Sequence, residues 1–83
     1  MKITIKYFAS IREAVGTGGE SLETSALTLG ALRDELIARG GPHALALARG
    51  RALRIAQNQA MAIESLVLLE GAEIAFFPPV TGG

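Results

Sequence analysis

The sequence predicts an α+β domain in which a mixed β-sheet packs against one main helix and an extended C-terminal tail follows. A first and a last segment alternate apolar and polar residues, as half-buried strands do. Between them leucines recur at helical spacing, and the chain closes on FFPPVTGG, where prolines stop the last strand. A chain of 83 residues has room for one domain. We therefore expect a single domain over residues 1-83, with residues 78-83 as a flexible functional tail.

The first part of the chain predicts a strand, a short helix and a second strand. Every second residue is apolar over residues 2–7, which is the pattern of a strand with one buried face. Ser10 and Glu13 have the spacing of a capping box, so a short helix should begin there and end at Gly16. A glycine-rich turn then leads into a second strand over residues 20–24, which can form a hairpin with the first.

The main helix is predicted from Thr28 onward. Thr28 is a candidate N-cap, because threonine side chains accept a hydrogen bond from the free amides of the first turn. Leu29, Leu32 and Leu36 then fall on one helical face. Gly40-Gly41-Pro42 ends this helix, and the proline suits the first turn of a second, short one.

The last part of the chain predicts the remaining strands. Leu53 and Ile55 alternate with polar or small residues, Asn58-Gln59 resembles a hairpin turn, and residues 59–63 can return as a short strand. The final strand, residues 73–77, ends at two prolines. If the first and last strands lie side by side, a sheet with one long helix between its halves has the β-grasp arrangement.

Charge and composition argue against several functions. Eight basic and eight acidic residues give no net charge, so we expect neither nucleic acid nor a membrane as partner. Without cysteine the chain has no disulfide, thiolate metal site or cysteine nucleophile. No apolar segment is long enough to cross a bilayer, and we expect a cytoplasmic protein. His43, the one histidine, is expected to be an exposed surface residue, not a metal ligand or catalytic base.

Two phenylalanines are placed unexpectedly in their strands. Phe8 and Phe77 both fall on the polar side of the alternation. If the first and last strands pair, the two rings lie together on the solvent face, and Met61 can join them. Aromatic residues and methionine often dominate the binding energy of protein interfaces. We therefore expect Phe8, Met61 and Phe77 to bind a partner; the alternative is that a bulge or a covering loop buries them.

The C-terminal tail combines a stiff proline segment with a thin glycine tip. Pro78 and Pro79 fix their φ angles and cannot donate backbone hydrogen bonds, so they favour an extended course away from the sheet. Gly82 and Gly83 have no Cβ, so this tip can pass through a narrow channel. The sequence thus predicts a stiff spacer, a thin tip and a terminal carboxylate that acts as the functional group.

These segments resemble a known family. The ending FFPPVTGG with GAEIA before it, the opening KYFASIREAVGT and the turn AQNQ are similar to the small, sulfur-carrying subunits of molybdopterin synthase, which are ubiquitin-like in fold. The resemblance implies that Gly83 carries sulfur as a thiocarboxylate and that Gly82 is the neck behind it. It also implies that Phe8, Met61 and Phe77, with Pro78, Pro79, Val80 and Thr81, contact a larger partner.

The resemblance further implies the partners and the reaction. A ubiquitin-activating-like adenylyltransferase would use ATP and magnesium to adenylate Gly83, and this chain itself would bind no cofactor. The large synthase subunit, in a heterotetramer of two small and two large subunits, would receive the sulfur for cyclic pyranopterin monophosphate and supply the catalytic groups. A chain without cysteine cannot hold sulfur as a side-chain persulfide, which agrees with a carrier that uses its terminus.

Three other functions remain open from the sequence. A sulfur carrier for thiamine or another thio-compound would share the fold and tail. A ubiquitin-like modifier would form isopeptide bonds to lysines of target proteins. A plain interaction domain would need neither Gly82 nor Gly83.

Overall fold

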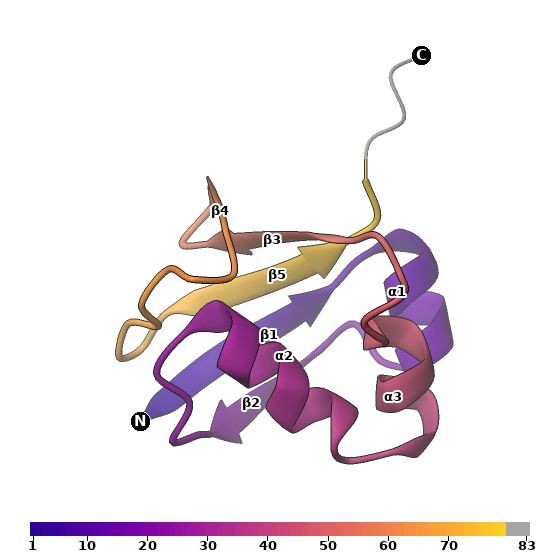
Figure 1. Ribbon diagram of the computed structural model, residues 1–83, viewed down its shortest axis with the longest axis horizontal. Coiled ribbons are helices and arrows are strands. Elements are labelled where there is room, and N and C mark those ends of the chain that lie inside the picture. Colours follow the sequence, from indigo (N-terminus) through magenta and orange to yellow (C-terminus); the bar gives the residue numbers. More distant parts are fainter. Residues whose placement is uncertain (80–83) are drawn as a thin grey trace.

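The protein, described here by a computed structural model over residues 1–79, folds into two layers (Figure 1). A mixed five-stranded sheet forms one layer, and helices cover one of its faces. In chain order the elements are β1 (Lys2–Tyr7), α1 (Ala9–Val15), β2 (Gly19–Glu23), α2 (Leu29–Ile37), α3 (Gly41–Leu47), β3 (Arg54–Gln57), β4 (Ala60–Ala62) and β5 (Glu73–Phe77).

The strand order is β2-β1-β5-β3-β4, so the first and last strands lie side by side at the centre of the sheet. β1 and β5 run parallel, with Ile5 opposite Ile74 and Tyr7 opposite Phe76, whereas the other neighbouring strands are antiparallel. This is the β-grasp arrangement of ubiquitin-like proteins, and the predicted fold is confirmed. Because β1 and β5 are parallel, both end at the same edge of the sheet, which is where the tail leaves (Figure 1).

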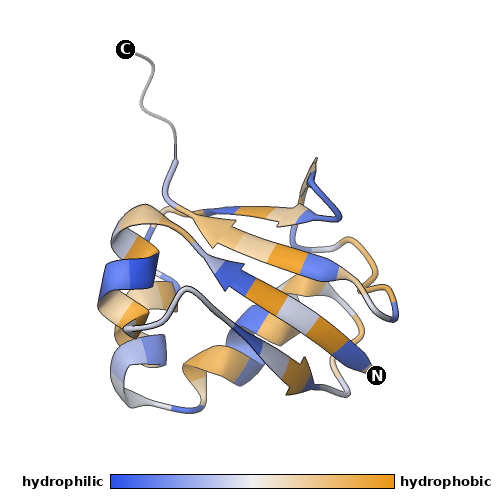
Figure 2. Ribbon diagram, turned by 180° about the vertical axis from the view of Figure 1, so that it is seen from behind, coloured by the Kyte–Doolittle hydropathy of each residue, from blue (hydrophilic) through white to orange (hydrophobic). Residues whose placement is uncertain are grey.

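The hydrophobic core lies between the sheet and the helices. Leu29, Leu32 and Leu36 of α2 are completely buried against it, as the helical spacing predicts. Along β1 the buried and exposed residues alternate without exception, and Figure 2 shows the same alternation in hydropathy. The face of the sheet away from the helices is here called the outer face. It therefore carries the residues at the polar positions of the strand alternation.

The helix ends follow capping rules, with one correction. The Thr28 side chain accepts a hydrogen bond from the Ala31 amide at 3.1 Å, which confirms the predicted N-cap of α2. Gly16 ends α1 in the left-handed conformation, at φ 91°. The predicted capping box at Ser10 is wrong, because α1 already begins at Ala9. Phe8 is the N-cap, still extended at φ −124°, and makes no side-chain capping bond.

The β3–β4 connection is a two-residue hairpin turn. Asn58 and Gln59 have φ angles of 50° and 69°, the left-handed values that a tight hairpin requires at both central positions. The return strand is shorter than predicted, three residues inside the expected 59–63. No helix in residues 1–79 has the length and apolar character needed to cross a membrane.

Candidate functional site

A row of side chains crosses three neighbouring strands on the outer face, next to the tail. Phe8 follows β1 and donates its amide to the Phe76 carbonyl at 3.1 Å, which places it beside Phe77. Phe77 in turn lies directly opposite Arg54 of β3. The predicted pairing of the first and last strands therefore brings the two phenylalanines together. Both occupy polar positions in the alternation of their strands, so both lie on the outer face.

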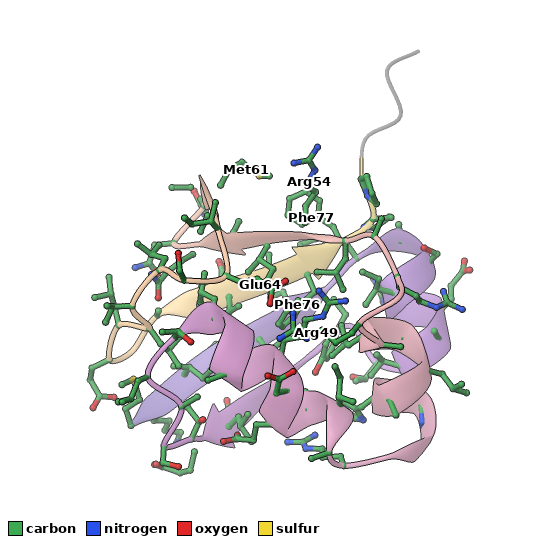
Figure 3. All side chains as sticks on the ribbon, viewed as in Figure 1. Arg49, Arg54, Met61, Glu64, Phe76 and Phe77 are labelled. Atoms are coloured by element: carbon green, nitrogen blue, oxygen red, sulfur yellow. The ribbon has the colours of Figure 1, made fainter. Side chains whose placement is uncertain are left out.

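Met61 extends this row onto β4. It lies opposite Ala56, so it is a diagonal neighbour of Arg54 on the same face. Figure 3 shows Met61, Arg54 and Phe77 together on the outer face, with the helices on the other side of the sheet. Phe8 is 47% exposed, Met61 is 60% exposed and Phe77 is half-buried. We call Phe8, Met61 and Phe77 the outer patch.

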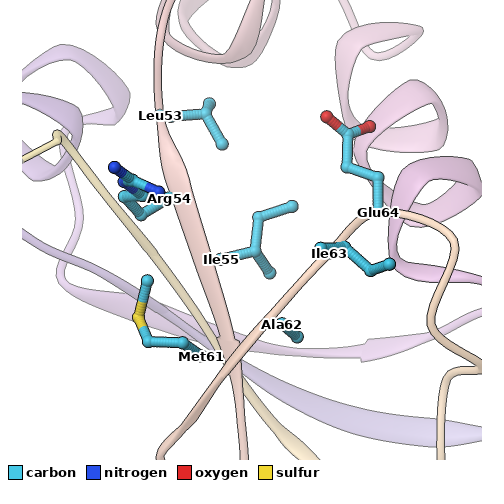
Figure 4. A pocket seen from close by; sticks show the side chains of 7 residues that line it. All are labelled: Leu53, Arg54, Ile55, Met61, Ala62, Ile63 and Glu64. Atoms are coloured by element: carbon cyan, nitrogen blue, oxygen red, sulfur yellow. The ribbon is translucent and has the colours of Figure 1, made fainter.

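Two hollows flank the outer patch. The larger, about 360 Å³, lies along β3 and β4; Figure 4 shows Arg54 and Met61 on one side of β3, with Ile55 and Glu64 on the other. The smaller, about 230 Å³, adjoins Phe8. The larger is more open than enclosed, which suits the contact surface of a protein better than the enclosed site of a small molecule. The larger is lined by Leu53, Arg54, Ile55, Met61, Ala62, Ile63 and Glu64, and the smaller by Lys6, Phe8, Gln59, Glu73 and Ala75.

An ion cluster holds the wall of the larger hollow in place. Arg33 of α2 is 4% exposed, and its guanidinium donates to the Glu64 carboxylate at 3.0 Å. Arg49 donates to the same carboxylate and also to the Gly30 carbonyl. Burial raises the pKa of Glu64, but the hydrogen bonds and charges of Arg49 and Arg33 outweigh it and hold the pKa below its usual value. The carboxylate that borders the hollow is therefore ionised and fully engaged.

Arg33 also closes the C-terminal end of α3. It donates to the backbone carbonyls of Leu47, Ala48 and Arg51 at 2.8, 2.7 and 3.1 Å. Carbonyls at the end of a helix lack partners within it, so a buried cation is well suited to this position. Sequence reasoning missed this role, because an arginine on a helix is ordinarily assigned to the solvent face and no periodic pattern marks it.

His43 is not the exposed residue that the sequence predicts. It is half-buried, its Nε2 lies 3.0 Å from the Glu20 carboxylate, and its ring meets Tyr7 edge-on. Tyr7 donates its hydroxyl to the same carboxylate at 2.8 Å, and burial raises the pKa of Tyr7. The cluster joins β1 and β2 to α3 on the helix-covered side of the sheet, so it belongs to the fold and not to the outer face.

The tail residues divide at Val80. Pro78 and Pro79 are half-buried and continue β5 at the edge of the outer patch. The other predicted site residues, Val80, Thr81, Gly82 and Gly83, lie outside the described residues. Within residues 1–79 no group of three or more His, Cys, Asp or Glu side chains could hold a metal ion. The described part of the predicted site is thus an exposed, largely apolar surface at the base of the tail.

Comparisons with known proteins agree with this geometry. The chain is 42% identical, over 98% of its length and 99% of theirs, to the molybdopterin synthase sulfur carrier subunits of Haemophilus influenzae and Escherichia coli. It is also similar to a chain in the solved complex of subunits 1 and 2 of molybdopterin-converting factor from Helicobacter pylori, with 26% identity, complete coverage of both chains and a TM-score of 0.67. The ThiS family model matches residues 5–83. The chain therefore belongs to the ThiS family.

Proposed function

We propose that this protein is the sulfur carrier subunit of a molybdopterin synthase and carries sulfur as a thiocarboxylate on Gly83. One observation carries the proposal: the chain is 42% identical over nearly its whole length to two proteins of that name. The geometry agrees, because an exposed apolar patch lies at the base of the tail that bears Gly83. The sequence agrees as well, since it has no cysteine and the terminus is then the position for transferable sulfur.

The chemistry at Gly83 requires activation, because a carboxylate is a poor electrophile. A carboxylate oxygen attacks the α-phosphorus of ATP, and pyrophosphate leaves. Hydrosulfide then attacks the acyl carbon of this adenylate, AMP leaves with the electron pair of the broken C–O bond, and the proton on sulfur is lost to solvent. The thiocarboxylate that results is ionised and nucleophilic at neutral pH. Its sulfur attacks a carbon of cyclic pyranopterin monophosphate and displaces an oxygen substituent there. Water then cleaves the acyl–sulfur bond of the resulting thioester, which leaves the sulfur on the product and restores the carboxylate of Gly83.

The described residues would serve this reaction by docking. The outer patch and Pro78-Pro79 would bind the large synthase subunit, so that the tail enters its active site with two slim glycines at the tip. The solved Helicobacter pylori complex, which joins two subunits, supports a partner of this kind. We further propose a heterotetramer of two small and two large subunits, activation of Gly83 by a separate adenylyltransferase that uses ATP and magnesium, and action in the cytoplasm. The catalytic groups and any cofactor would belong to these partners.

Deletion of Gly83 tests the proposal. In a reaction reconstituted from the activating enzyme, ATP, a sulfur source, the large subunit and cyclic pyranopterin monophosphate, the full chain should yield molybdopterin and the shortened chain none. The shortened chain should still bind the large subunit, because the outer patch is unchanged. Full activity without Gly83 would overturn the carrier function. Covalent conjugates on lysines of other proteins, in place of molybdopterin, would show a modifier instead.

A further inference from the structure

Arg54 lies inside the outer patch, although the sequence gives it no special role. Its Cα is paired with that of Phe77, it borders the same hollow as Met61, and its side chain is exposed (Figures 3 and 4). Within residues 1–79 its guanidinium takes part in no ion pair or side-chain hydrogen bond, which is also true of Arg12 and Arg51, whereas the remaining arginines are paired with carboxylates. Arg54 differs from Arg12 and Arg51 in its position, because it places an unpaired cation between Phe77 and Met61.

The other charges near Arg54 are already neutralised. Lys6 and Glu73, which also lie on the outer face, form an ion pair with each other at 3.5 Å. Glu64, the one carboxylate that lines the larger hollow, is engaged by Arg33 and Arg49. Both carboxylates that border the two hollows, Glu64 and Glu73, are therefore paired with other cations, and the charge of Arg54 faces whatever covers the patch.

A partner that covers the outer patch must also cover Arg54. Burying a guanidinium without an acceptor carries a large desolvation penalty, which a purely apolar partner cannot offset. A carboxylate matches the planar fork of arginine with two parallel hydrogen bonds and cancels the charge. Charge complementarity thus restricts the partner to a surface that places an acidic side chain among apolar ones.

We propose that Arg54 is a specificity-determining residue that pairs with an aspartate or glutamate of the large synthase subunit, at the centre of the interface formed by the outer patch. This rests on the proposed function, which supplies the partner. The apolar rings provide contact area, and Arg54 selects among partners, because a surface without the matching carboxylate leaves the guanidinium unpaired.

Calorimetric titration of the large subunit from the same organism tests this pairing. Arg54→Glu should weaken binding by roughly 30-fold or more, the usual effect of breaking a buried charge pair. Arg54→Gln should weaken it less, and its affinity should fall less steeply with added NaCl than that of the wild type, because one screened charge is gone. Lys2→Glu is the matched control: the same charge change on the same face, at the far end of β1, should alter the affinity less than about twofold.

A rescue experiment identifies the partner group. Each acidic residue on the large subunit's binding surface is replaced by arginine in turn, and one of these variants should restore binding of Arg54→Glu. Circular dichroism and thermal melting confirm that each carrier variant is folded. If the wild type binds but Arg54→Glu behaves like Lys2→Glu, the Arg54 pairing is wrong and the carrier function stands. If the folded wild type does not bind the large subunit at all, the proposed function itself fails.

Discussion

Phe8 exposes 47% of its surface at the base of the tail, and its replacement by aspartate should weaken binding of the large synthase subunit. A phenylalanine side chain offers about 200 Å² of apolar surface, so about 100 Å² is available to a partner. At about 25 cal/mol per Å², covering this area contributes about 2.5 kcal/mol, which is roughly 70-fold in the dissociation constant. This value applies when the partner covers the whole exposed area, and the new carboxylate adds a desolvation penalty to it.

The assay is calorimetric titration of Phe8→Asp with the large subunit, well below the melting temperature of the variant. The temperature matters because the buried part of the ring also contributes to folding. Leu45→Asp is the control, since Leu45 is 69% exposed but belongs to α3 in the helix layer. Its affinity should equal that of the wild type. An affinity of Phe8→Asp within about twofold of the wild type would refute the outer patch as the docking surface.

Three further predictions concern the scaffold. Arg33→Met should lower the free energy of unfolding by about 3 kcal/mol or more in urea titrations, because it leaves buried carbonyls and a carboxylate without their partner; a loss under about 1 kcal/mol would contradict this role. Gly19→Ala should destabilise by about 1–3 kcal/mol, since its Cβ would lie 2.7 Å from the Ile5 carbonyl oxygen, whereas Gly50→Ala meets open space and should be neutral. Burial raises the pKa of Glu20, but hydrogen bonds with His43, Arg39 and Tyr7 outweigh it and lower the pKa below 4.5. A carboxyl whose pKa is lower in the folded than in the unfolded state stabilises the fold at pH values above its unfolded pKa, and this contribution is lost as the pH falls. The free energy of unfolding of Glu20→Gln should therefore fall less steeply below about pH 4.5 than that of the wild type. An equally steep fall in both proteins would contradict this role.

Residue alternation was sufficient to predict the two faces of the central strands β1 and β5, where burial alternates along the strand. Phe8 and Phe77 are apolar residues at polar positions of their strands, and the parallel pairing of β1 with β5 places them next to each other on the outer face. The Thr28 cap and the Asn58-Gln59 turn were equally accessible, because each depends on one local hydrogen bond or backbone angle. Features decided by neighbours in sequence, or by the period of a strand or helix, could thus be predicted.

Features that depend on contacts between distant elements could not. Arg33 bonds to residues 14 to 31 positions away, and His43 pairs with Glu20 across 23 residues. Local spacing does not indicate the partners of Arg33 or His43, so the sequence alone would assign both residues to the solvent-exposed surface. Arg54 is a similar case, because its place beside Phe77 follows from the register of β3 on β5. The Ser10 capping box failed because α1 begins one residue earlier, at Ala9, with Phe8 as its N-cap directly after β1.

The central claim, that Gly83 carries sulfur, is tested most directly by intact-mass spectrometry. The protein is incubated with its activating enzyme, ATP and a sulfur source, then digested so that the modified peptide can be found. A thiocarboxylate on Gly83 should appear as a mass gain equal to the replacement of one oxygen atom by one sulfur atom, confined to the C-terminal peptide and lost when ATP is omitted. An unchanged mass, or sulfur on any other peptide, would contradict it.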